Sequence, residues 1–138
     1  MIIGMHHAAI AVVDLQRMLG FYRDLAGFRI VHEGAWEPGN ARIDALTDLK
    51  GSSARFVVLH GGNCYLELFQ YTTPTPRPND LKRPVSDAGI THVCLVSDDI
   101  EADYRRMSEA GVRFTRRPIR QVRCVPPTAA SRRGTSLN

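Results

Sequence analysis

The sequence lacks the long apolar runs of membrane proteins and contains few cysteines. No stretch of about 18 consecutive apolar residues occurs, and the N-terminus has no signal-peptide pattern. The three cysteines are far apart and form no CxxC pair, so neither a disulfide framework nor a zinc ribbon is indicated. We therefore expect a soluble, cytoplasmic protein that folds as a single domain over residues 1–138 and has no membrane partner.

Acidic residues are missing from the last 27 positions, which contain seven arginines. Residues 1–111 carry 11 Lys and Arg against 14 acidic residues, so the net charge of +4 comes entirely from this tail. A basic tail can bind phosphates by counterion release, but no reading helix accompanies these arginines. A solvated chain end is the simpler interpretation, and we expect no nucleic-acid partner.

What the sequence does contain is an internal repeat. Residues 4–15 and 89–100 read GMHHAAIAVVDL and GITHVCLVSDDI, and most of their apolar positions coincide at an offset of 85. His7 and His92 occupy equivalent positions in the two copies. Each copy predicts a strand followed by a helix, because its apolar residues continue at spacings of three and four.

Capping residues indicate where the two predicted helices begin and end. Asp14 stands before the first helix, and Asp98 with Glu101 three residues later resembles a capping box for the second. Gly27 and Gly111 stand where a left-handed residue would end each helix, and a strand-like run follows each glycine.

The remaining elements complete a repeated βαβββ pattern. Further strands are expected at about 28–33, 54–60 and 63–71, with a glycine turn at 61 and 62 and a short helix near 43–49. The fold class is therefore α+β, with two βαβββ modules pairing into an open curved-sheet barrel. Module one spans residues 1–71, a proline-rich linker spans 72–88, and module two spans 89–138. The second module is incomplete at its C-terminus and has an atypical tail over 122–138.

Three residues form a candidate metal site. Repeated modules bring equivalent positions together at their interface, which places His7 near His92. Glu67 is the only charge in the apolar strand NCYLELFQY, and burying an unpaired carboxylate there is costly. Two imidazoles and a carboxylate suit one divalent ion such as Zn, Ni, Co, Mn or Fe.

The runs HHAAIAVVDLQRMLGFYRDLAGF, YLELFQY and GITHVCLVSDDI resemble the vicinal oxygen chelate superfamily. This superfamily includes glyoxalase I, methylmalonyl-CoA epimerase, extradiol dioxygenases and bleomycin-resistance proteins. The resemblance implies a divalent metal that is chelated by two substrate oxygens and held by His7, Glu67 and His92. A ligand at the Glu67 position is typical of the glyoxalase and epimerase branches.

The resemblance also implies a fourth ligand, a glutamate in the last strand of module two. The repeat places it near position 151, beyond residue 138, and the sequence after residue 122 contains neither the expected turn nor any acidic residue. Natural divergence and a shifted reading frame near residue 121 both explain this tail. Without that glutamate, Glu67 is the only candidate for the catalytic base, and as a metal ligand it would be a compromised one.

These features predict a metal-dependent lyase or isomerase of the glyoxalase or epimerase type, impaired by loss of the fourth ligand. It would stabilise an enediolate or enolate of a small carbonyl substrate. The alternative is a non-catalytic small-molecule binder of the bleomycin-resistance type, and the third is an Fe(II)-dependent extradiol-type dioxygenase.

The partner would be a small-molecule substrate or ligand, and the sequence does not identify it. Four residues of the long loop are candidates for the mouth of its pocket: Trp36, Glu37, Asn40 and Arg42. A chain that lacks its final strand would expose a sheet edge, so we also expect a homodimer.

Overall fold

The structure is a computed structural model and describes residues 1–80 and 82–118. The chain divides into two compact units, Met1–His92 and Val93–Asn138. The predicted atypical tail at 122–138 lies outside the described residues. None of the described helices is long and apolar enough to cross a membrane.

The first unit contains one complete βαβββ module, which confirms the predicted α+β class. Strand β1 (His7–Ala11) is followed by helix α1 (Leu15–Leu19), which continues as the π-helix η1 (Gly20–Leu25). The other elements are β2 (Arg29–Trp36), α2 (Ala41–Thr47), β3 (Ser53–Gly61) and β4 (Cys64–Thr73). The strands form one sheet in the order β1-β4-β3-β2, with β1 parallel to β4 and the other pairs antiparallel.

Local sequence explains the start and end of the first helix. The Asp14 side chain accepts a hydrogen bond from the backbone N–H of Arg17 at 2.9 Å, as an N-cap does. Gly27 adopts the left-handed conformation with φ of 75°, and the N–H of Phe28 then reaches the carbonyl oxygen of Tyr22. A hydrogen bond of 3.0 Å from the backbone N–H of Leu15 to the Gln70 side chain ties the start of α1 to β4.

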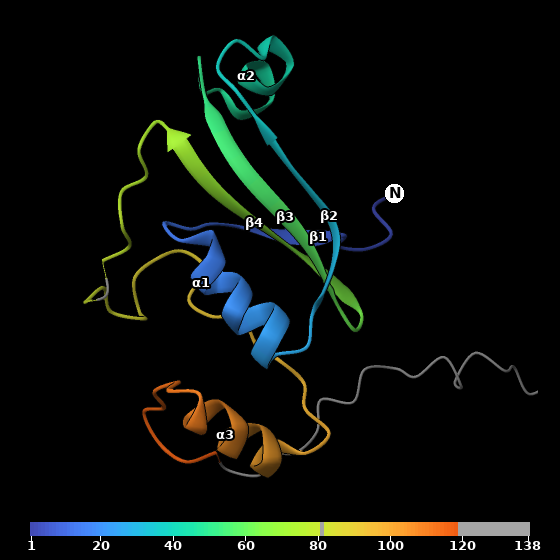
Figure 1. Ribbon diagram of the computed structural model, residues 1–138, viewed down its shortest axis with the longest axis vertical. Coiled ribbons are helices and arrows are strands. Elements are labelled where there is room, and N and C mark those ends of the chain that lie inside the picture. The colour runs from blue at the N-terminus through green and yellow to red at the C-terminus, as the bar shows by residue number, and fades with distance from the viewer. Residues whose placement is uncertain (81, 119–138) are drawn as a thin grey trace, which may run out of the picture. The chain divides into compact units, whose positions relative to one another are not determined.

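The core of the first unit lies between its helix and one face of the sheet (Figure 1). Leu15, Leu19 and Tyr22 of the helix are buried against alternate residues of β3 and β4. These strand residues are Val57, Leu59, Leu66 and Leu68. Burial of such side chains contributes about 1.5–3 kcal/mol each, so this layer is the main source of the unit's stability.

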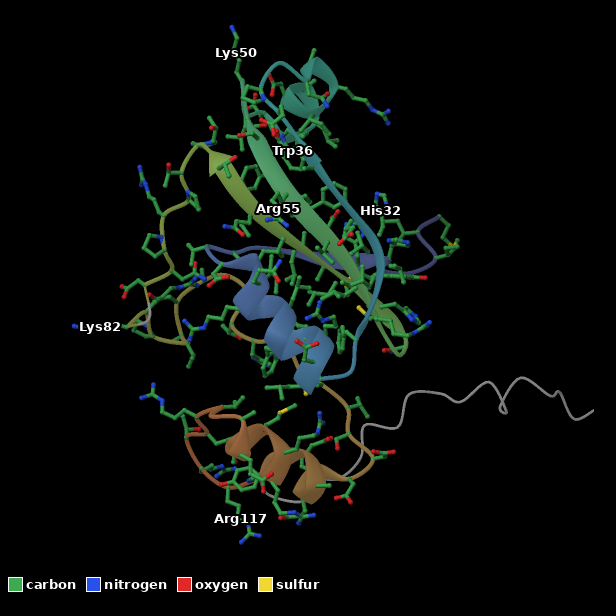
Figure 2. The ribbon with its side chains drawn as sticks, in the orientation of Figure 1. His32, Trp36, Lys50, Arg55, Lys82 and Arg117 are labelled. Atoms are coloured by element: carbon green, nitrogen blue, oxygen red, sulfur yellow. The ribbon has the colours of Figure 1, made fainter. Side chains whose placement is uncertain are left out.

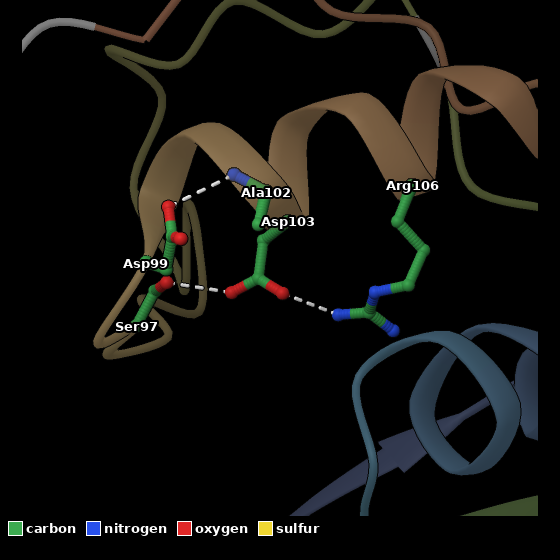
Figure 3. A network of polar contacts seen from close by, with 5 residues as sticks. All are labelled: Ser97, Asp99, Ala102, Asp103 and Arg106. Carbon is green, nitrogen blue, oxygen red and sulfur yellow. Dashed lines mark hydrogen bonds and ion pairs between the residues drawn. The ribbon is translucent and has the colours of Figure 1, made fainter.

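The second unit contains helix α3 (Ile100–Glu109) among its described residues. Its N-cap is Asp99, which accepts from the N–H of Ala102 at 3.0 Å, so the capping box expected at Asp98 was wrong by one residue. Asp99 is the repeat equivalent of Asp14. Hydrogen bonds from Ser97 and Arg106 lower the pKa of Asp103 and fix the first turn of the helix (Figure 3).

The strands that the repeat predicts before the second helix and directly after Gly111 are not formed in the described residues. A strand requires hydrogen bonds from a neighbouring strand. At the repeat offset of 85, the counterparts of β3 and β4 fall at about 138–158, outside the described residues. Gly111 itself is left-handed with φ of 84°, as the repeat with Gly27 predicts.

Gly61 provides a test of the packing beside the hairpin. A Cβ atom at this position would lie 2.3 Å from the Phe28 ring, whereas a Cβ at Gly20 would meet nothing within 4 Å. We expect Gly61→Ala to lower the free energy of unfolding by about 1–3 kcal/mol, because the ring must move. Gly20→Ala, in a helical conformation, should leave it unchanged or raise it by up to about 1 kcal/mol. Chemical denaturation measures both, and equal effects would contradict the packing.

Candidate functional site

The sheet has a second face, turned away from α1 and η1. Because side chains alternate along a strand, the residues between the buried core positions point to this side. Cross-strand pairing places them in register. We call this surface the open face; the side chains that form it are those of His7, Ala9, Ala11, Arg29, His32, Trp36, Ala54, Phe56, Val58, His60, Tyr65, Glu67, Phe69 and Tyr71.

Two of the three predicted metal ligands meet on the open face. His7 lies on β1 opposite Tyr65, and Glu67 lies two residues further along β4. The Nε2 atom of His7 and the Oε2 atom of Glu67 are 3.4 Å apart. Two ligands bound at about 2.1 Å to one tetrahedral ion lie about 3.4 Å apart, so this pair fits a shared divalent ion.

The Glu67 carboxylate is largely withdrawn from water. Its side chain is 18% exposed, compared with 43% for His7. Among the described strands, it is the only acidic side chain on the open face. A carboxylate in such surroundings needs a cation or a proton donor nearby. His7 lies close enough to bind the same cation as Glu67.

A neighbouring histidine holds the His7 ring in place. The Nδ1 atoms of His6 and His7 are 2.8 Å apart, and the His6 ring stacks on Tyr65 with a centroid distance of 4.9 Å. One of the two Nδ1 atoms must donate and the other accept. If His7 Nδ1 donates, its Nε2 atom keeps the lone pair that a metal requires.

The third predicted ligand, His92, is exposed and lies outside the strands. Its Nδ1 atom is 2.9 Å from the hydroxyl oxygen of Thr91. Among residues 1–80 and 82–118, no group of three or more His, Cys, Asp or Glu side chains could hold a metal ion. The role of His92 therefore stays a prediction.

The four predicted pocket residues have different positions. Trp36 ends β2 on the open face and is buried, whereas Glu37 and Arg42 are exposed on the loop and on α2. Asn40 accepts a hydrogen bond of 3.2 Å from the N–H of Ile43 and is the N-cap of α2. The structure thus gives Asn40 a structural task, and only Trp36 lies on the face that carries His7 and Glu67.

Sequence reasoning missed the aromatic side chains that surround Trp36. Its ring lies 5.9 Å from Phe69 and 5.7 Å from Tyr71, and Phe56 lies 5.9 Å from Phe69. Figure 2 shows Trp36 and His32 along β2, with Trp36 nearer to α2. The signal was present, because Phe69 and Tyr71 follow Glu67 at the two-residue period of a strand.

A short chain of hydrogen bonds fixes the Trp36 indole. Its N–H donates to the hydroxyl oxygen of Ser52 at 3.1 Å. The Asp44 carboxylate accepts from the backbone N–H groups of Gly51 at 2.8 Å and Ser52 at 3.3 Å. Helix α2 therefore holds the loop that orients Trp36.

The comparisons with known proteins agree with this fold. The family model of the Glyoxalase/Bleomycin resistance protein/Dioxygenase superfamily matches residues 4–123. A glyoxalase family protein from Bacillus cereus has a similar structure with a TM-score of 0.72 and 19% identity, over 80% of this chain and 74% of that one. The protein SMU.1112c has a TM-score of 0.56 and 21% identity, over 80% and 76% of the two chains. A search of curated protein sequences found no match.

The Asp44 hydrogen bonds give a prediction for Trp36, the only tryptophan. Asp44→Ala leaves two backbone N–H groups without their acceptor, so we expect a loss of about 1–3 kcal/mol in unfolding free energy. The fluorescence of Trp36 should also shift to longer wavelength as the indole gains water. Asp48→Asn is the control, because it also removes a carboxylate charge. Asn tolerates the left-handed conformation of Asp48, whose φ is 55°. Unchanged fluorescence in Asp44→Ala would contradict the tether.

Proposed function

Because the chain belongs to the Glyoxalase/Bleomycin resistance protein/Dioxygenase superfamily, we propose that it is a divalent-metal-dependent lyase or isomerase of the glyoxalase or epimerase type. The observation that carries this proposal is the 3.4 Å contact between His7 Nε2 and Glu67 Oε2 on the open face. One imidazole nitrogen and one carboxylate oxygen are compatible with Zn, Ni, Co, Mn or Fe.

The residues that would hold the ion are His7 and Glu67, with His92 as the proposed third ligand. A divalent ion bound there would supply Lewis acidity toward a carbonyl oxygen of the substrate. His6 would keep the Nε2 atom of His7 directed at the site through the contact between their Nδ1 atoms.

Glu67 is the group proposed to move the proton next to the substrate carbonyl. Its placement on a half-buried strand, beside Tyr65 and Phe69 on the same face, limits the access of water. A carboxylate that also binds a metal is a weaker base than a free one. Because of this dual role, we expect slow turnover.

Metal content tests the site directly. We expect near-stoichiometric divalent metal in the purified protein by mass spectrometry, and at least about 10-fold less in His7→Ala and Glu67→Gln. His32→Ala is the matched control, because His32 lies on the open face in the same cross-strand row as Glu67, two strands away. A folded wild type that takes up no Ni, Zn, Mn or Fe would contradict the proposal. Loss of metal in His92→Ala would support His92 as the third ligand, and retention of metal would exclude His92 from the site.

Proton exchange tests the chemistry. We expect the metal-loaded protein to transfer solvent deuterium to the carbon beside the carbonyl of a dicarbonyl thiol adduct or an acyl-CoA epimer, followed by NMR. Glu67→Gln should abolish this exchange and His32→Ala should not. Product formation that requires Fe(II) and oxygen would instead indicate the dioxygenase.

The aromatic part of the open face favours a second candidate, a small-molecule binder of the bleomycin-resistance type. Phe56, Phe69 and Tyr71 offer half-buried ring surface that requires no metal. Tight ligand binding by a metal-free protein, without turnover, would favour this candidate over the enzyme.

In the described part of the chain the sheet has two edge strands, which support the proposed homodimer. Strands β1 and β2 are the edge strands, and Val31 on β2 is 49% exposed. We expect light scattering to give twice the chain mass of 15.4 kDa. If the β2 edge forms the contact, a charge placed by Val31→Lys should give the monomer. A wild type with the mass of one chain would contradict the dimer.

A further inference from the structure

We propose that the open face recognises an aromatic ring of the ligand. We call the four side chains Trp36, Phe56, Phe69 and Tyr71 the aromatic platform. The ligand class that fits is a small carbonyl compound with an aromatic ring close to its chelating oxygens. The chelating end of this ligand rests on the function proposed above, whereas the ring end rests on the platform alone.

The rings of the platform support one another in preferred geometries. Trp36 meets Tyr71 at an interplanar angle of 84° and Phe69 at 70°, both edge to face. Phe69 and Tyr71 are stacked with centroids 6.1 Å apart. Aromatic pairs prefer such offset and edge-to-face arrangements, so a further ring can extend the cluster without rearranging it.

The platform keeps accessible surface although the sheet already has a core on its other side. Trp36 is 8% exposed, and the other three rings are half-buried. None of them belongs to the core cluster under α1. One face of the sheet packs against the helix, so the second apolar face is available for binding.

Strand geometry sets the distance between the platform and the metal pair. Phe69 follows Glu67 by two residues on β4, and same-face neighbours on a strand lie about 7 Å apart. A ring that rests on Phe69 is therefore joined to the chelating oxygens directly or through one or two atoms. Aromatic 2-oxo acids and aromatic dicarbonyls have this shape.

The tether through Ser52 and Asp44 prepares the platform before a ligand arrives. The indole of Trp36 cannot turn away without losing its hydrogen bond to Ser52. Side chains that are already ordered lose little entropy on binding, which favours recognition of a small ring.

The test compares phenylglyoxylate with pyruvate, which has the same 2-oxo acid oxygens and a methyl group in place of the ring. Quenching of Trp36 fluorescence and isothermal titration calorimetry both report binding. We expect phenylglyoxylate to bind about 10-fold more tightly than pyruvate, in the metal-loaded protein and in protein treated with EDTA. Phe69→Leu should reduce this ratio to near one, with Tyr71→Leu as a second variant if the first does not fold.

Phe28→Leu is the matched control, because Phe28 packs on the core side of the same sheet. The ring preference should survive in this variant. Equal affinities for the two probes in wild type, or a preference that persists in both platform variants, would overturn the inference. A ring preference in a protein that binds no metal would support the platform and contradict the metal enzyme. Metal binding without a ring preference would support the metal enzyme and contradict the platform.

Discussion

The parallel pairing of β1 with β4 is the constraint on which the site depends. It brings the first strand of the module beside the last, in a register that puts His7 opposite Tyr65 and Ala9 opposite Glu67. Ala9 has a single methyl group, so the His7 ring can reach along the sheet to the carboxylate. A shift of one residue in this register would put His7 and Glu67 on opposite faces of the sheet, because side chains alternate along strands.

The local pattern of the sequence was sufficient for the first module. Two-residue alternation located β3 and β4, and the glycine turn fixed the hairpin, in which Gly61 pairs with Cys64. Asp14 and Gly27 fixed the ends of the helix in the same way. Among residues 89–118 the predicted strands are absent, because strand formation depends on pairing and a local pattern contains no information about the partner.

The sequence predicted the part of the candidate site that follows from the repeat and from one charged residue in an apolar strand. An isolated glutamate in an apolar strand indicated Glu67, and strand periodicity put His7 on a face with small residues. The place of Trp36 in the aromatic platform required the cross-strand register, since Trp36 pairs with Ala54 and Ala54 pairs with Tyr71. Such three-strand relations are not contained in any single segment.

In the proposed function, the two faces of the sheet separate stability from recognition. Leu59 and Leu68, which are fully buried, stabilise the module from the helix side, so the open face is free to carry a carboxylate, histidines and half-buried rings. This division also explains why the enzyme and the binder are close alternatives. Both would use the aromatic platform, and they differ only in whether His7 and Glu67 hold an ion. Ring selectivity therefore identifies the class of ligand, whereas metal binding by this pair decides whether the protein can transform it.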